Sequence, residues 1–424
     1  MKILFVIDTF YTSNNGTSTS AQHFVAGLRR LGHEVRLLCG DKPRTEADKS
    51  LTDGDFCIGI FHFPIFQFLC EKHDFFYGKW DKKVIKEACD WADVVHLYTP
   101  LFMSNATLKY CKQVGKPVTA AYHIQPENIT SSLGVGKVKW INDMIYKIFR
   151  HFTYSHVRHI HTPSFFIANE LRKHDYFAQM HIISNGINEE FLDAGKKKIN
   201  GERTKGERTK GLFKIMMIGR LSQEKRQDVI IKAMKYSKYA DRIQLVFAGK
   251  GPEYEHYLEL GKGLKNKPQF IFRHRDELIQ ELLSTDLYIH ASDMEIEAIS
   301  CIEAFATGLV PVIANSPASA TPQFSLDERC LFLPGDPKDL ARAIDYWLDH
   351  PQERKQMEEK YVRNAYKYTI GHCTVLFEQM LKQEIIDNSN ITNNDSYETT
   401  QDTSHVTVLG AIKRQVIRLY RRIA

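Results

Sequence analysis

The sequence predicts an α/β protein with two Rossmann-like, doubly wound domains that face each other across a cleft. Short apolar runs alternate with segments of helical periodicity along most of the 424 residues, which is typical of βαβ units and parallel sheets. A basic segment that contains GERTK twice in succession divides this pattern into two comparable halves. Each half is long enough for its own core, and a cleft between two such domains is a common ligand site.

The expected strands follow one another in chain order. In the first half they span residues 2–8, 34–39, 94–99, 117–123 and 181–184, with a helix over 17–31. In the second half they span residues 213–219, 243–249, 270–273, 287–292 and 310–314. Ligands of such sheets bind outside the carboxyl ends of the strands, so the residues that follow each strand are the first candidates for a site.

Changes in composition predict five segments. The first domain is expected over residues 1–188, a basic linker over 189–212, and the second domain, with a terminal crossover helix, over 213–385. Residues 386–408 are rich in Asn, Thr, Ser and Asp, which predicts a disordered tether. Residues 409–424 carry apolar side chains on one helical face and five cations without an acid. This is the pattern of an amphipathic helix in a membrane interface, although a helix docked on the protein surface is the alternative.

The composition narrows the class of protein. Hydrophobic residues make up 43%, charged residues 25%, and the net charge is +6, so no nucleic-acid partner is expected. The eight cysteines have no metal-type spacing and are interpreted as reduced thiols. The first apolar run stops at Asp8, too early for a signal peptide, and no stretch approaches the roughly 18 apolar residues of a membrane span. These features predict a cytoplasmic protein.

The strongest chemical signal is a pair of acids in the second half. Glu295 precedes Glu303 by eight positions in ASDMEIEAISCIEAFATG, after an expected strand and at the start of an expected helix. The acids are embedded in apolar residues, and the backbone N–H groups near Ala298, Ile299 and Ser300 would form an anion site. A solvated acidic pair near a helix start is the alternative interpretation.

Cations and glycines follow other strands. Arg220 and Lys225 lie in IGRLSQEK, after Gly219, where two cations suit a diphosphate, although a basic helix entrance gives the same pattern. The turn AGKGPE, which includes Gly251, is a weaker signal. In the first half, Gly16 would allow close backbone approach, although an ordinary capped helix also begins in this way.

His123 ends another strand of the first half. It would lie at the carboxyl edge of the sheet and face the cleft, where it could bond a sugar hydroxyl. A structural role is the alternative, since a single histidine is more often part of a core.

Together these residues resemble family 4 of the retaining glycosyltransferases, which have the GT-B fold. The resemblance spans roughly residues 1–385 and rests on E-x7-E with EAFATGLVPVIA, GRLSQEKR, SNGIN, the Gly16 loop and His123. It implies that the first domain binds the acceptor and the second a nucleotide-diphosphate hexose. Glu303 would hold the donor ribose, Glu295 would contact the sugar, and His123 would orient it. The donor diphosphate would be bound by Arg220 and Lys225 with Gly16, Gly219, Gly251 and the backbone of Ala298, Ile299 and Ser300.

The chain departs from the family pattern at two places. The first glutamate is usually followed, after one residue, by Phe-Gly, whereas Glu297 and Ala298 stand here. Glu297 therefore competes with Glu295 as the acid that contacts the sugar. Asn188 replaces a more typical aspartate.

No metal or other cofactor is expected. The two cations and a helix N-terminus can neutralise the charge on a leaving diphosphate. The triplet Asp53–Gly54–Asp55 matches a metal-binding DxD pattern, but three-residue matches are common and this one lies in another region.

A lipid or lipid-linked acceptor is suggested by three segments. Residues 61–69 are aromatic-rich, and residues 137–161 form a helix-like stretch that mixes aromatic and basic side chains, although either could be core. Residues 409–424 would add contact with an anionic membrane. The sequence thus favours a peripheral enzyme on the inner face of a membrane, acting on a UDP-hexose. The alternatives are the same chemistry on a soluble or polysaccharide acceptor, and a non-catalytic protein that binds sugar nucleotides.

Overall fold

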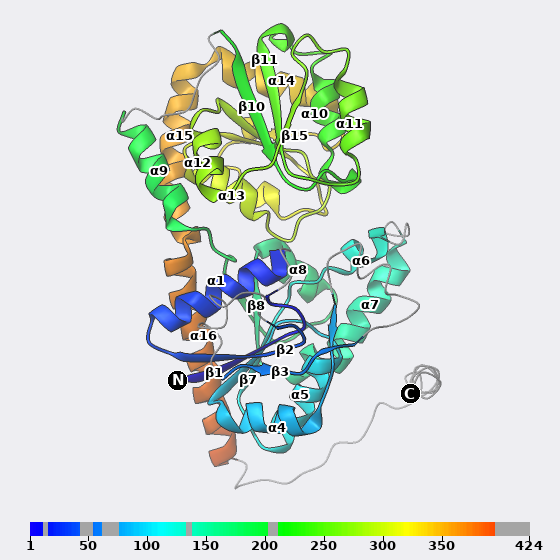
Figure 1. The fold of residues 1–424 in the computed structure, drawn as a ribbon, viewed down its shortest axis with the longest axis vertical. Helices are drawn as coiled ribbons and strands as arrows, with labels where there is room; N and C mark the ends of the chain where they lie inside the picture. Colours follow the sequence, from blue (N-terminus) through cyan, green and yellow to red (C-terminus); the bar gives the residue numbers. More distant parts are fainter. Residues whose placement is uncertain (12–15, 43–53, 62–75, 133–137, 202–210, 395–424) are drawn as a thin grey trace. The chain divides into compact units, whose positions relative to one another are not determined.

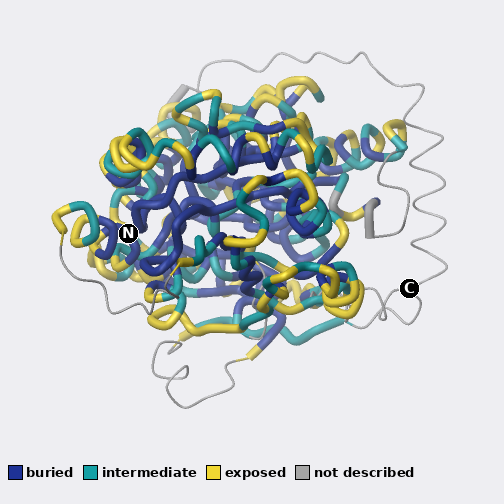
Figure 2. Tube along the Cα trace, turned by 90° about the horizontal axis from the view of Figure 1, so that it is seen from above, coloured by how far each residue is buried: buried dark blue, intermediate teal, exposed yellow. Residues whose placement is uncertain are grey.

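The computed structural model describes residues 1–11, 16–42, 54–61, 76–132, 138–201 and 211–394. It contains two parallel sheets, each covered by helices (Figure 1). Buried residues follow the strands, whereas exposed residues gather on the outer faces of helices and on loops (Figure 2). The predicted fold class of two α/β domains is therefore confirmed; residues 409–424, expected as an amphipathic helix, lie outside the described residues.

The first sheet has seven strands in the order β3-β2-β1-β6-β7-β8-β9. All neighbouring pairs are parallel. The order reverses on either side of β1, so the carboxyl ends of β1 and β6 flank a topological switch point, where α/β sheets bind ligands. The strands are β1 (Lys2–Ile7), β2 (Glu34–Cys39), β3 (Phe56–Cys57), β6 (Val94–Leu97), β7 (Val118–Ala121), β8 (His159–Thr162) and β9 (Gln179–Ile182).

Alternate residues of β1 face two different helical layers. Leu4 and Val6 pack in one cluster with side chains of α4, α5 and α7, whereas Phe5 packs in the other with Phe24 of α1. A small hairpin of β4 (Ile60–Phe61) and β5 (Tyr77–Gly78) lies beside this sheet. The helices are α1 (Gly16–Arg30), α4 (Lys82–Trp91), α5 (Phe102–Gln113), α6 (Pro126–Ser132), α7 (Lys139–Phe152), η1 (Tyr154–His156) and α8 (Phe165–Lys173).

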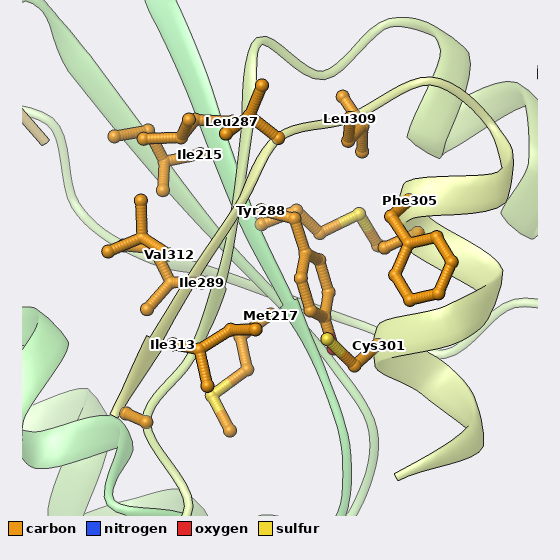
Figure 3. Close-up of a cluster of buried hydrophobic side chains, with 14 of the residues drawn as sticks. Ile215, Met217, Leu287, Tyr288, Ile289, Cys301, Phe305, Leu309, Val312 and Ile313 are labelled. Atoms are coloured by element: carbon orange, nitrogen blue, oxygen red, sulfur yellow. The ribbon is translucent and has the colours of Figure 1, made fainter. Parts of the chain in front are cut away.

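The second sheet has six parallel strands in the order β12-β11-β10-β13-β14-β15. Its switch point lies between β10 and β13. Tyr288 of β13 lies beside Cys301 of α13 in the core, whereas Val312, the register partner of Ile289, lies on the other face of the sheet (Figure 3). The strands are β10 (Phe213–Ile218), β11 (Ile243–Ala248), β12 (Gln269–Ile271), β13 (Leu287–His290), β14 (Pro311–Ala314) and β15 (Leu331–Phe332).

Sequence-local caps define several helices of the second half. Asp336 accepts the N–H groups of Lys338 and Asp339, and Pro337 occupies the first position of α14, as expected for a helix start. The helices are α9 (Glu189–Ile199), α10 (Gln227–Ala233), α11 (Tyr254–Gly261), α12 (Arg275–Leu283), α13 (Ile299–Ala306), α14 (Pro337–Asp349), α15 (Pro351–Ala365) and α16 (Ile370–Asn394). The short 3-10 turns are η2 (Gln223–Lys225), η3 (Ala240–Arg242), η4 (Thr321–Phe324), η5 (Glu328–Cys330) and η6 (Tyr366–Tyr368).

Helix α16 follows the second sheet in sequence and packs against the first. Phe377 stacks on Phe24 of α1 with ring centroids 4.4 Å apart. Gly27 of α1 permits this approach, because a Cβ there would lie 2.2 Å from Oγ1 of Thr374. Glu384 adds a salt bridge of 2.5 Å to Arg158.

Two segment boundaries need correction. Residues 189–212 are not a linker throughout, because Glu189–Ile199 form α9, whose Phe191 and Leu192 are buried and whose Gly195 lies against the carbonyl of Ala306. The segment 386–408 begins as helix, since α16 continues to Asn394.

The stretch 137–161 is not one helix. It contains α7, η1 and the start of β8, a strand that the sequence pattern did not reveal. Within the described residues, no helix is long and apolar enough to cross a membrane.

Candidate active site

The loops after β10 and β11 are joined along their backbones. Leu221 N–H donates to the carbonyl of Lys250 at 3.0 Å, and Glu253 N–H donates to the carbonyl of Leu221 at 3.0 Å. Gly251 is required by this contact, since a Cβ there would lie 2.2 Å from the Leu221 oxygen. Arg220 lies in the same loop and is exposed at the carboxyl end of β10. Gly251 therefore shapes the loop that presents Arg220.

Lys225, Glu295 and His290 form a charged cluster. Oε1 of Glu295 lies 2.5 Å from Nζ of Lys225 and 3.0 Å from Nε2 of His290, which ends β13. Burial alone would raise the pKa of the Glu295 carboxyl, but the charge of Lys225 and the bond to His290 outweigh it and hold that pKa below its ordinary value. Glu295 is thus a carboxylate at neutral pH.

The N-terminus of α13 lies at the end of β10. Ser300 Oγ donates to the carbonyl of Ile218 at 3.2 Å, which places the first turn beside Gly219. The N–H groups of Ile299 and Ser300 precede the first bonds within the helix, so they can serve an external acceptor. Ala298, the N-cap residue, adopts a left-handed conformation with φ of 72°.

Glu303 lies one turn further along α13 and is half-buried. Burial raises the pKa of its carboxyl to about 7, and the nearby cation Arg275 of α12 offsets this only in part. Near neutral pH, the side chain can therefore gain or lose a proton in response to a ligand.

Glu297 does not share the environment of Glu295. Its Oε2 accepts the N–H of Asn185 at 3.0 Å, and its side chain is buried, with Oε1 lacking a hydrogen-bond partner. Burial raises the pKa of this carboxyl to about 7. Of the two acids that competed for sugar contact, Glu295 is the one in the charged cluster, and Glu297 contacts the segment that follows β9.

The carboxyl edge of the first sheet carries buried polar groups. His123 follows β7, stacks on Tyr98 with centroids 4.6 Å apart, and has an Nε2 atom without a partner. Burial, with His161 and His96 nearby, lowers the pKa of His123 well below its ordinary value, so the ring is neutral. Asp8 follows β1 and accepts from Thr99 Oγ1 at 2.5 Å.

The remaining predicted positions are also located. Gly16 begins α1 and is exposed, and a Cβ added there would meet no atom within 4 Å. Packing within the described residues therefore does not explain this glycine. Asp55 accepts from Leu37 N–H and from the hydroxyl of Tyr11, while Asp53 lies outside the described residues.

Several of the predicted site residues of the second domain are in direct contact. Lys225 meets Glu295, Ser300 meets the end of β10, and a Cβ on Gly219 would touch Lys225. Sequence reasoning missed His290 and Asp8. Both end a strand at a switch point, and that position is the signal by which they could have been found.

Comparison with protein families accounts for most of the chain. Residues 14–191 match the model described as Glycosyltransferase Family 4, and residues 199–367 match Glycosyl transferases group 1. The chain belongs to glycosyltransferase family 4. It is a glycosyltransferase with the GT-B fold.

The chain is similar to three curated proteins over most of its length. It is 24% identical to alpha-monoglucosyldiacylglycerol synthase of Streptococcus pneumoniae, over 74% of this chain and 71% of that protein. It is 24% identical to the GDP-mannose-dependent alpha-mannosyltransferase of Mycobacterium tuberculosis, over 74% and 79%. It is 23% identical to sulfoquinovosyl transferase SQD2 of Arabidopsis thaliana, over 85% and 69%.

Solved structures agree on the fold. Anabaena Alr3699/HepE in complex with UDP has a TM-score of 0.67 and 16% identity, with 90% of this chain and all of that chain covered. The catalytic domain of cholesterol-alpha-glucosyltransferase from Helicobacter pylori is 47% identical, over 37% of this chain and 99% of that one. Its TM-score of 0.34 is too low to support a structural inference.

Proposed function

We propose that this glycosyltransferase transfers a hexose from a UDP-sugar to a membrane lipid or lipid-linked saccharide, with retention of the anomeric configuration. The observation that carries the donor half of the proposal is the cluster of Lys225, Glu295 and His290 beside the N-terminus of α13. Cations and free N–H groups at a switch point are suited to a nucleoside diphosphate.

The proposed donor contacts are those that the family resemblance implies. Arg220 and Lys225 bind the diphosphate, with the N–H groups of Ile299 and Ser300. Lys225 exchanges its bond to Glu295 for the phosphate, and Glu295 then contacts the sugar. Glu303 accepts the ribose hydroxyls, and Gly16 leaves room for the backbone to approach the donor.

The reaction needs no protein nucleophile. The bond from the anomeric carbon to the phosphate oxygen breaks, and the acceptor oxygen forms its bond on the same face. The proton of the acceptor hydroxyl passes to the leaving phosphate oxygen, which releases UDP. His123, neutral and with Nε2 unpartnered, accepts or donates a bond to a hydroxyl of the transferred sugar. The cations stabilise the leaving group without a metal.

The acceptor proposal rests on two independent supports. One relative is named for a lipid product, a monoglucosyldiacylglycerol. In addition, Trp140 and Met144 of α7 and Ile129 of α6 are exposed, by 67%, 44% and 36%. Helix α6 follows β7 and His123 by a few residues in the chain. The exposed apolar side chains of α6 and α7 offer contact to an acyl chain.

A donor and acceptor screen tests the function. Purified enzyme is incubated with UDP- and GDP-hexoses, with lipid extract or soluble oligosaccharide as acceptor, and fresh product is examined by proton NMR. We expect an α-linked glycolipid from a UDP-sugar, with activity that survives EDTA. A β-linked product excludes retention, and a saccharide product excludes the lipid acceptor. Binding of a UDP-sugar without its hydrolysis and without sugar transfer would indicate a non-catalytic protein.

Membrane association has its own test. The proposed anchor, residues 409–424, lies outside the described residues, and α16 continues to Asn394, so truncation after Asn394 removes the anchor without cutting the helix. Each basic residue near an anionic surface contributes roughly 1 kcal/mol. The truncated enzyme should stay in the supernatant with anionic vesicles at low salt while donor hydrolysis persists. If it sediments as the full chain does, the exposed α6 and α7 side chains become the anchor.

A further inference from the structure

A continuous line of contacts joins His123 to the start of α13. His123 stacks on Tyr98, and the Tyr98 hydroxyl lies 2.7 Å from Ser20 Oγ. Ser20 donates to Oδ1 of Asn185 at 2.5 Å, so Tyr98 must be the donor to Ser20. Asn185 in turn donates its N–H to Glu297, the residue before Ala298. The line thus runs from the first sheet into the turn that opens the donor helix.

Every member of this line is withdrawn from water. Ser20 and Tyr98 are fully buried, Asn185 is 6% exposed and Glu297 is 2% exposed. Hydrogen bonds in such surroundings are costly to leave unmade. A shift of one member therefore disturbs its neighbours, which gives the line a defined geometry.

The turn that it holds is strained. Ala298 has φ of 72° and ψ of 71°, a left-handed conformation that is unfavourable for a residue with a Cβ. Such strain persists only where the surroundings hold it. The turn receives hydrogen bonds from the first domain. Asn185 N–H donates to Glu297, and Ser164 Oγ donates to the Ile296 carbonyl at 2.7 Å.

Glu297 suits this role in its neutral form. The ionisable groups that interact with it are Tyr98, Tyr368 of η6 and Cys373 of α16, none of which is a cation. Burial raises the pKa of Glu297 to about 7 despite bonds from Ser184 and Asn185. As the pH rises through that value, the carboxyl gains a buried charge.

We propose that Tyr98, Ser20, Asn185 and Glu297 are positioning residues that fix the left-handed turn at Ala298, and with it the N-terminus of α13, relative to His123. The two residues that replace Phe-Gly in the family pattern, Glu297 and Ala298, are then explained together. A glycine adopts the left-handed conformation freely, whereas alanine needs an anchor, and the carboxyl of Glu297 supplies it. The inference rests on the proposed donor site at α13.

The test measures UDP binding by calorimetry in matched variants. Glu297→Leu, which removes the anchor, should weaken UDP binding by at least about fivefold, because the strained turn relaxes. Glu297→Gln keeps the acceptor for Asn185 and should bind within about twofold of wild type. Adding Ala298→Gly to Glu297→Leu should restore binding to within about twofold, because glycine needs no anchor.

Two further readouts separate positioning from stability. The ratio of wild-type to Glu297→Gln affinity should fall from about pH 6 to about pH 8, as Glu297 ionises. Thr107→Val removes another buried hydroxyl, bonded within α5, and should leave UDP affinity unchanged. Failure of glycine to rescue Glu297→Leu, or full affinity in Glu297→Leu itself, overturns the proposal. If Arg220→Ala also binds UDP normally, the donor site itself is wrong.

Discussion

The side chains at the carboxyl edges of the two sheets differ in their charge. At the second sheet, Lys225 and Glu295 are charged and paired, with His290 as a third partner. At the first sheet, Asp8 and His123 are buried, and burial moves the pKa of each in the direction that favours its neutral form. This difference fits the proposed function, in which the second edge binds a diphosphate and the first contacts neutral hydroxyl groups.

The charged edge should be the more sensitive to loss of one side chain. Lys225→Ala removes a cation from the leaving diphosphate and leaves Glu295 without its closest partner. Loss of one group that stabilises transition-state charge costs roughly 10²–10³ in turnover, and we expect this range in donor hydrolysis. Lys232→Ala, which breaks a 2.8 Å pair with Asp228, is the matched control and should retain activity. Near-normal turnover in Lys225→Ala would contradict the proposal that the charged edge stabilises the leaving diphosphate.

At the neutral edge, the expected effect is a change in the free energy of unfolding with pH. Burial raises the pKa of Asp8 from 3.8 to about 6, although bonds from Thr99 and Gly78 oppose this. The folded state therefore holds the proton more tightly, so stability falls as the pH rises from about 4 to about 6, by roughly 2–3 kcal/mol. Asp8→Asn removes the charge, with its amide oxygen accepting from Gly78 N–H and its amide N–H donating to the Thr99 hydroxyl, and should remove this fall.

Denaturant unfolding across the same pH range measures the difference between wild type and Asp8→Asn. The exposed Asp93→Asn variant is the control and should follow wild type. Parallel curves of stability against pH for wild type and Asp8→Asn would show that the pKa of Asp8 is not raised in the folded protein. The contrast between the two edges would then be wrong.

The sequence revealed the charged edge better than the neutral one. Glu295, Glu303 and Lys225 have a fixed spacing within one domain, so a linear pattern can show them. Asp8 and Thr99 come together only because β1 and β6, far apart in the chain, are neighbours in the sheet. The predicted strands agree with the structure where apolar runs are long, as in β1 and β11.

Local features obscured other elements. Strand β8 contains His159 and His161, which mask its apolar character, and each histidine is buried through specific partners rather than through hydrophobicity. Helix α9 was hidden by three consecutive lysines in its last turn, where cations favour the helix dipole. These features depend on tertiary contacts that no local pattern records.

Glu303 should combine the properties of the two edges. It lies in the charged domain, yet burial raises its pKa to about 7. If the carboxylate accepts the ribose hydroxyls, UDP binds the ionised form, so the contribution of Glu303 to affinity should rise as the pH approaches about 7. Glu303→Gln should lose about tenfold in affinity above that pH and much of this dependence.

Calorimetry in buffers of different ionisation enthalpy checks the result, since wild type should release a proton on binding UDP below about pH 7. The exposed Glu259→Gln variant serves as the control. Unchanged affinity in Glu303→Gln would remove the ribose role from this residue.

The smallest effect is expected at Ala298, where backbone conformation alone is changed. Ala298→Gly relieves a left-handed alanine but adds freedom to the unfolded chain, and the net gain in the free energy of unfolding should be about 0.5–1 kcal/mol. Ala304→Gly, in the interior of the same helix, should instead lose roughly 0.5–1 kcal/mol. Thermal unfolding of both variants therefore tests a difference in sign. If both substitutions destabilise the protein, the turn at Ala298 is not strained, and the charged edge does not depend on an anchored backbone at the start of α13.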